Sequence, residues 1–246
     1  MRSAADLRRR WLETVPLLTS RTGMFARGGK EMETLARTLM GDLCFVDERD
    51  RDHEEIIQGL GDRFGKLGVY GPFAKMFGSE RDYAAEVVSV YAEHFHRLGY
   101  LDIDRRLEQA EWETLLTGVR DRFEERDVRR SEVVAAYGPP SLVVDGRVLC
   151  YASDDWVFFD SWTESRQEYV PGEGRYERVS DPDPLIRSVR VPSADFDGGL
   201  ILTLYGKVLR WGPGWWVRRP GVRASEATRV IAAQLRAVEA RDPSQR

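Results

Sequence analysis

Leu142-Val-Val-Asp-Gly-Arg-Val-Leu-Cys-Tyr151 is the stretch that decides the fold, because it predicts a β-hairpin near the middle of the chain. Two apolar runs flank Asp145-Gly146, and an Asp-Gly pair supplies the two positive φ angles that a type I′ turn needs. The chain before this hairpin has helical periodicity, whereas the chain after it has short strands and turns. The hairpin therefore predicts the point at which a helical layer gives way to a sheet.

Short apolar segments after the hairpin predict further strands. They are Trp156–Asp160, Leu185–Val191, Leu200–Tyr205 and Val208–Trp211. Gly206-Lys207 predicts a two-residue turn between the last two of these segments. The residues from 161 to 184 are rich in Pro, Gly and charge, which predicts a long loop with one extended piece near Tyr176. Connections this short favour antiparallel neighbours, because parallel strands need long crossovers.

Amphipathic helices account for most of the residues before the hairpin. Ser3–Asp6 predicts a capping box at the first of these helices. Ser79–Asp82 predicts the start of the most regular one, and Gly99 predicts its end. Pro16 predicts a kink or an early stop in the first helix. After the sheet, Ser225 predicts the N-cap of a last helix.

These patterns together predict an α+β fold. It consists of an N-terminal helical layer, an antiparallel β-meander sheet and a closing C-terminal helix. A chain of 246 residues can form one large domain or two modest ones. The change of periodicity predicts a helical domain over 1–128 and an antiparallel sheet domain with the closing helix over 129–246.

The composition argues against several classes of protein. The 37 basic and 41 acidic residues nearly balance, so nothing indicates the positive field of a nucleic-acid-binding protein. The two cysteines make neither a disulfide framework nor a zinc site, so we expect a reducing, cytoplasmic location and no metal or cofactor. No apolar run approaches the length of a membrane helix, and no secretory signal is visible at the N-terminus.

Candidate catalytic groups are few. His94 lies on the apolar stripe of a predicted helix, where we expect a hydrogen-bonded interior residue without a catalytic or metal-binding role. Asp154, Asp155 and Asp160 flank a tryptophan, and grouped carboxylates can carry out acid–base chemistry. Acidic residues are also ordinary at strand ends, so these three aspartates do not by themselves predict an enzyme.

Tryptophan is concentrated in the sheet half, where it can serve packing or recognition. The candidate partner-binding residues are Trp156, Trp162, Trp211, Trp215, Trp216, Arg218, Arg219, Asp154 and Asp155. Trp215 and Trp216 are adjacent in a predicted strand, so their rings leave opposite faces and one of them needs cover other than the main core. An exposed tryptophan beside an arginine is typical of an interface anchor. Packing and recognition both stay open here.

Two stretches have the pattern of known proteins. Trp11-Leu-Glu-Thr-Val-Pro-Leu-Leu-Thr-Ser-Arg-Thr-Gly-Met-Phe25 carries a variant of an "Arg-Pro-Gly-Met-Tyr-x-Gly" turn, with Thr22 in place of the proline and Phe25 in place of the tyrosine. An apolar helix to Gly41 follows it. Arg130-Ser-Glu-Val-Val-Ala-Ala-Tyr-Gly-Pro-Pro-Ser141 leads into the hairpin as a "helix, Gly-x-Pro, hairpin" unit.

The first stretch resembles small helical bacterial proteins, some of which look like immunity proteins of polymorphic toxin systems. The second is similar to a unit of several immunity proteins, which the β-lactamase-inhibitory proteins and small lipoproteins of outer-membrane assembly share. The resemblance implies a protein that acts by binding another protein. It supplies no catalytic residue.

We therefore expect a protein-binding module, an immunity- or antitoxin-like protein that blocks a partner protein without catalysis. The partner expected is a toxin or a component of a complex, with no membrane and no nucleic acid. One alternative is an enzyme, for example a hydrolase, with a pocket between the helical layer and the sheet. The other alternative is a structural or assembly component of a larger complex.

Overall fold

The computed structural model describes residues 3–25, 28–79, 81–124, 126–162, 166–170, 174–179, 181–212 and 224–239. The chain divides into two compact units. The first unit comprises Met1–Glu113, Pro140–Phe158 and Arg190–Leu200, and the second comprises Thr114–Pro139, Phe159–Val189 and Ile201–Arg246. The division predicted from periodicity, 1–128 and 129–246, stays a prediction.

The helices before the sheet are α1 (Ala4–Ser20), the 3₁₀ turn η1 (Thr22–Met24), α2 (Gly29–Val46), α3 (Asp50–Phe64), α4 (Tyr70–Phe77), α5 (Ala84–Arg97), α6 (Gln109–Phe123) and α7 (Arg130–Tyr137). The predicted capping box at α1 is confirmed, because the Ser3 hydroxyl accepts from the Asp6 amide at 3.2 Å and the Asp6 carboxylate accepts from the Ser3 amide at 3.3 Å. The early stop predicted at Pro16 does not occur, since α1 continues to its end at Ser20.

Helix α5 forms the centre of the first unit. Its residues from Ala84 to Glu93 are all buried, and it packs against α1, α2 and the first two strands of the sheet. The Asp82 carboxylate accepts a hydrogen bond from the Ala84 amide at 2.8 Å, and α5 begins at Ala84, two residues after the predicted start at Ser79–Asp82. Gly99 has a φ of +77° after the last turn, as predicted for its end.

The predicted hairpin is confirmed. Strands β1 (Leu142–Val144) and β2 (Val148–Ala152) are antiparallel, with Val144 opposite Val148. Asp145 and Gly146 have φ angles of 48° and 66°, and the Arg147 amide donates to the Val144 carbonyl at 2.9 Å. These are the positive φ angles and the closing hydrogen bond of a type I′ turn.

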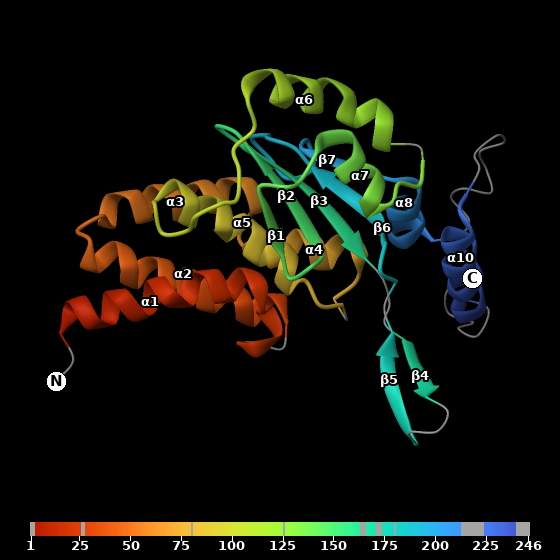
Figure 1. Ribbon diagram of the computed structural model, residues 1–246, viewed down its shortest axis with the longest axis horizontal. Helices are drawn as coiled ribbons and strands as arrows, with labels where there is room; N and C mark the ends of the chain where they lie inside the picture. The colour runs from red at the N-terminus through yellow and green to blue at the C-terminus, as the bar shows by residue number, and fades with distance from the viewer. Residues whose placement is uncertain are drawn as a thin grey trace. The chain divides into compact units, whose positions relative to one another are not determined.

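The main sheet is antiparallel and has the strand order β1-β2-β3-β6-β7, so the fold class is α+β as predicted (Figure 1). The remaining strands of this sheet are β3 (Trp156–Trp162), β6 (Leu185–Arg190) and β7 (Leu200–Leu202). Each of these three strands contributes residues to both units. In the second unit, the ring of Phe159 on β3 contacts Phe123 at 5.1 Å and Tyr137 at 5.8 Å between centroids.

The long loop predicted over 161–184 was wrong, although the extended piece predicted near Tyr176 is confirmed. Residues of this segment complete β3 and then form a two-stranded antiparallel sheet of β4 (Arg166–Val170) and β5 (Arg175–Val179), with Tyr169 opposite Tyr176. Half of the positions in these two strands are charged, so their sequence shows no clear apolar alternation.

The strand predicted over Leu200–Tyr205 is confirmed only as far as Leu202, where β7 ends. The strand predicted over Val208–Trp211 and the turn predicted at Gly206-Lys207 were wrong. The chain instead forms helix α8 (Leu204–Trp211), which Thr203 caps by accepting from the Gly206 amide at 3.1 Å. Gly206 serves close packing, because a Cβ at this position would lie 1.8 Å from the Arg187 carbonyl oxygen. Short apolar runs do not distinguish a strand from a buried helix by periodicity, which explains the error.

The closing helix is α10 (Glu226–Glu239), which packs against α8. Ser225 caps it as predicted, since its hydroxyl accepts from the Thr228 amide at 3.2 Å. The Asp127 carboxylate holds this cap in place by accepting from the Ser225 amide and the Thr228 hydroxyl, each at 2.7 Å. Among the described helices, none combines the length and the apolar character needed to cross a membrane.

Candidate functional site

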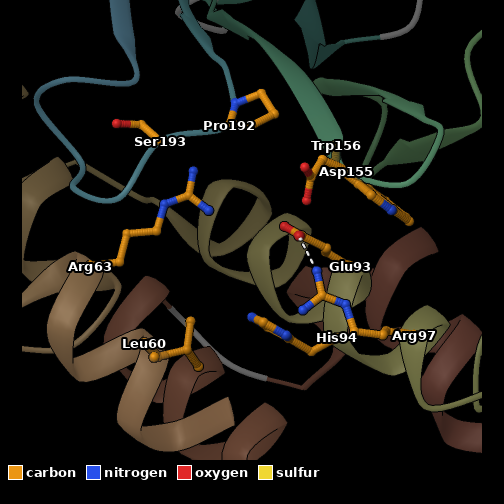
Figure 2. A pocket seen from close by; sticks show the side chains of 10 residues that line it. Leu60, Arg63, Glu93, His94, Arg97, Asp155, Trp156, Pro192 and Ser193 are labelled. Carbon is orange, nitrogen blue, oxygen red and sulfur yellow. Dashed lines mark hydrogen bonds and ion pairs between the residues drawn. The ribbon is translucent and has the colours of Figure 1, made fainter. Parts of the chain in front are cut away.

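A cavity of about 360 Å³ lies in the first unit, bounded by α3, α5, the β2–β3 turn and the segment that follows β6 (Figure 2). Its lining residues are Gly59, Leu60, Arg63, Glu93, His94, Arg97, Asp155, Trp156, Pro192 and Ser193. Cavities of a few hundred Å³ that combine apolar walls with a few convergent polar groups are typical ligand sites. We therefore take this cavity as the main candidate site.

Helical spacing brings the polar groups of the cavity together. Leu60 and Arg63 are three residues apart on α3, and Glu93 and Arg97 are four apart on α5, so each pair shares a helix face. Figure 2 shows the Arg63 guanidinium and the carboxyl groups of Glu93 and Asp155 facing the same space. The Arg97 guanidinium donates to the Glu93 carboxylate at 3.1 Å.

Glu93 is a buried carboxyl group, with 6% of its surface exposed. Burial raises its pKa above the ordinary value, because the charged form loses its hydration. The guanidinium groups of Arg63 and Arg97 act in the opposite direction, and the nearby carboxylate of Asp155 adds to the rise. A carboxyl group with a raised pKa can hold a proton that an ordinary glutamate has lost.

His94 lies beside Glu93 and lines the cavity. Burial lowers the pKa of its imidazole to about 4, and the positive charges of Arg97 and Arg63 lower it further, so the ring is neutral at pH 7. Its Nδ1 is buried and has no hydrogen-bond partner in the described part of the chain. The hydrogen bond expected for an interior histidine is therefore missing at this nitrogen.

Arg63 is the most exceptional group of the cavity. Its Nε is buried and has no hydrogen-bond acceptor among the described residues. The guanidinium carbon lies 5.4 Å from the ring centroid of Phe64. Burial lowers the pKa of this arginine, the positive charge of Arg190 adds to that effect, and the carboxylate of Glu93 opposes it. A partly buried cation whose Nε is buried without an acceptor is suited to holding an anion.

The arrangement can hold an anionic group and exchange a proton. Arginine matches the geometry of carboxylate and phosphate oxygens, and a buried carboxyl group can act as a general acid or base. Within the described residues no group of His, Cys, Asp and Glu side chains could hold a metal ion.

The structure separates the candidate aspartates. Asp154 is exposed and forms an ion pair with Arg106. Asp155 is also exposed, and its carboxylate lies at the cavity. Asp160 is buried in the second unit, where its carboxylate accepts from the Ser188 hydroxyl at 2.8 Å. Of the three, Asp155 lines the cavity.

The candidate tryptophans lie in different environments. Trp156 is buried, with 3% of its surface exposed, and it forms part of the cavity wall. Trp162 is partly buried, and the Arg187 guanidinium carbon lies 4.7 Å from its ring centroid. Trp211 ends α8 and is 50% exposed. The remaining candidates, Trp215, Trp216, Arg218 and Arg219, lie outside the described residues.

Sequence reasoning missed the polar residues of the cavity, which are Arg63, Glu93 and Arg97. A glutamate four residues before an arginine on a helix is ordinarily a solvated pair, so its burial had no local signal. Arg63 follows Gly61 and Asp62 near the end of a predicted helix and looks equally solvated. The one usable hint was the place of Glu93 next to the apolar stripe of α5.

Comparisons of the chain with protein family models, with curated proteins and with solved structures found no significant match. The resemblance to immunity proteins therefore stays a prediction.

Proposed function

We propose that the protein acts by binding another protein, and that the exposed end of α8 anchors this contact. Trp211 carries the proposal, because half of its surface is exposed although the preceding residues of α8, from Leu204 to Leu209, are all buried. A helix packed on all sides holds its last residue in a defined position. A rigid, exposed aromatic residue is a favourable anchor, since little side-chain entropy is lost on binding.

Arg210 supports the same proposal. Its guanidinium carbon lies 5.1 Å from the ring centroid of Trp211, so a cation–π contact orients the indole. Tryptophan and arginine are the residue types most enriched among interface hot spots. The sequence places Trp215, Trp216, Arg218 and Arg219 shortly afterwards, so the composition of the segment is consistent with a recognition surface.

The concrete form of this proposal is an immunity- or antitoxin-like protein that occupies the surface of a toxin without catalysis. Candidate partners are the products of the neighbouring genes, which can be expressed together with this chain and tested for copurification and for relief of toxicity. A partner that copurifies is then titrated against the purified protein. We expect Trp211→Ala to weaken binding by at least ~2 kcal/mol, which is the size of a hot-spot effect.

Phe45→Ala is the matched control, because Phe45 is an exposed aromatic residue at the end of α2 with 73% of its surface accessible. This variant should bind as tightly as the unmodified chain. Unchanged affinity in Trp211→Ala, or an equal loss in both variants, would reject the end of α8 as the anchor.

An enzyme is the second candidate, and the cavity of the first unit favours it. Glu93 and Asp155 face the same space, as Figure 2 shows, and the pKa of Glu93 is raised by burial. Two carboxyl groups with different environments are a common arrangement for acid–base catalysis. Nitrophenyl esters and phosphoesters test this candidate. Turnover that is lost in both Glu93→Gln and Asp155→Asn would support it, and turnover that survives either substitution would count against it.

A further inference from the structure

We propose that the cavity of the first unit binds a small molecule through an oxyanion group, either a carboxylate or a phosphate, with Arg63 as the principal ligand. The proposal concerns binding, and it requires neither the protein contact at α8 nor catalysis by the carboxyl groups. It rests on the position of Arg63, on the balance of charge around the cavity and on the nature of its walls.

Arg63 presents a donor that the protein itself does not use. Its Nε is buried and has no acceptor among the described residues, and no ion pair joins its guanidinium to a carboxylate in that part of the chain. Leaving a buried donor unsatisfied costs free energy, and for a charged donor the cost is greater. An oxyanion in the cavity would accept from this nitrogen and neutralise the charge.

Two other arginines near the cavity already have partners. Arg97 donates to Glu93 at 3.1 Å. Arg190 donates to the Ser89 hydroxyl at 2.8 Å, and its guanidinium carbon lies 4.3 Å from the ring centroid of Phe158. Arg63 and Arg97 line the cavity with Glu93 and Asp155, and Arg190 acts on Glu93 electrostatically, so these five groups carry one excess positive charge even when both carboxyl groups are ionised. Such surroundings favour an anion over a cation.

The accessible lining of the cavity is mostly polar, with a smaller apolar part that can contact a short apolar group beside the oxyanion. Leu60, Trp156 and Pro192 supply apolar surface, and Ser193 supplies a hydroxyl group. A volume of about 360 Å³ is at the lower end of the range for ligand sites, so the ligand is a small metabolite rather than a nucleotide or a peptide.

Glu93 makes the binding depend on pH. The groups that act on its carboxyl are Arg63 on α3, Arg97 on α5, Asp155 in the β2–β3 turn and Arg190 on β6. His94 stays neutral above about pH 4. As the pH falls and Glu93 takes up a proton, the cavity loses a negative charge, so an anion should bind more tightly. Sulfate tests this pH dependence, because the charge of sulfate does not change over the pH range in which Glu93 takes up its proton.

Isothermal titration with sodium phosphate, sulfate and acetate, each compared with chloride at equal ionic strength, tests the proposal. At least one oxyanion should bind saturably to the unmodified chain. Arg63→Gln should weaken that binding by about tenfold or more, as expected for a lost charge-assisted contact. Arg51→Gln is the matched control on the same helix, since Arg51 is 89% exposed and pairs with Glu55, and it should change affinity less than about twofold.

The phosphate and acetate arms identify which oxyanion the site prefers, and saturable binding in either arm supports the proposal. Nuclear magnetic resonance on the unmodified chain locates the binding site even if the Arg63→Gln variant does not fold. The indole N–H signal of Trp156, assigned with Trp156→Phe, should shift with the same saturation curve. Absence of saturable binding, equal binding by Arg63→Gln, or an unmoved Trp156 signal would each overturn the proposal.

Discussion

The carboxylate of Glu93 accepts a hydrogen bond from the guanidinium of Arg97, one helical turn further along α5, at 3.1 Å. The two side chains differ sharply in environment, because 8% of the Glu93 side chain is exposed against 55% of the Arg97 side chain. Water reaches the cation and weakens the attraction, whereas the carboxylate pays the full penalty of burial. This difference explains why the pKa of Glu93 is raised despite its ion pair.

Glu93→Gln should therefore change how stability depends on pH. The folded pKa of Glu93 lies above its unfolded value of about 4.3, so the folded state holds the proton longer. The contribution of this group to stability is fully present below about pH 4.3 and is lost as the pH rises through the folded pKa. Relative to the unmodified chain, Glu93→Gln should gain stability as the pH rises. Urea unfolding at several pH values measures this difference, and Glu55→Gln, at an exposed glutamate, is the comparison variant.

His94→Gln should have the opposite dependence. The folded pKa is about 4 and the unfolded value is about 6.5, so the unfolded state takes up the proton first. The stability that His94 contributes is present above about pH 6.5 and is lost as the pH falls toward 4, by up to about 3 kcal/mol. Acid should therefore destabilise His94→Gln less than it destabilises the unmodified chain. Equal losses on acidification in both proteins would contradict the burial of a neutral imidazole.

Gly206→Ala should destabilise the second unit strongly. The added Cβ would lie 1.8 Å from the Arg187 carbonyl oxygen, a backbone atom that cannot turn aside. We expect a loss of about 3 kcal/mol or more, as for severe overpacking. Gly118→Ala in α6 is the control, because its Cβ would meet nothing within 4 Å. That substitution should raise stability by about 0.5–1 kcal/mol through helix propensity. Thermal and urea unfolding separate the two outcomes.

Trp156→Ala and Trp211→Ala should differ in stability. Trp156 has 3% of its surface exposed, and its ring centroid lies 5.9 Å from that of Phe158, so truncation should cost about 3–5 kcal/mol. Trp211 is 50% exposed, and its truncation should cost less than about 1 kcal/mol. Chemical unfolding of both variants measures the difference. A large loss in Trp211→Ala would mean that the ring is part of the core, which would remove the basis for a binding anchor.

The helix cap and the hairpin turn were predicted correctly, because interactions between residues close in the sequence determine them. Ser3 and Asp6 cap each other within one turn, and Asp145 with Gly146 closes a hairpin whatever surrounds it. Tertiary contacts decided the rest. In the sequence Gly206 is typical of a turn residue. In the structure it is required because the Arg187 carbonyl packs directly against it. The cavity also required the fold, because Arg63 and Glu93 belong to separate helices and neither is distinguished by its neighbours in sequence.

The small β4–β5 sheet has a consequence for engineering the chain. It lies in the sequence between β3 and β6, which are already neighbours in the main sheet, so it is an insertion within a continuous hairpin. Two strands alone are barely stable in water. Asp183, however, accepts from the Ser131 amide and hydroxyl at 2.8 and 2.7 Å and so belongs to the start of α7. Residues 163–180 could therefore be replaced by a short turn, or used to display a foreign loop, without altering the strand order of the main sheet.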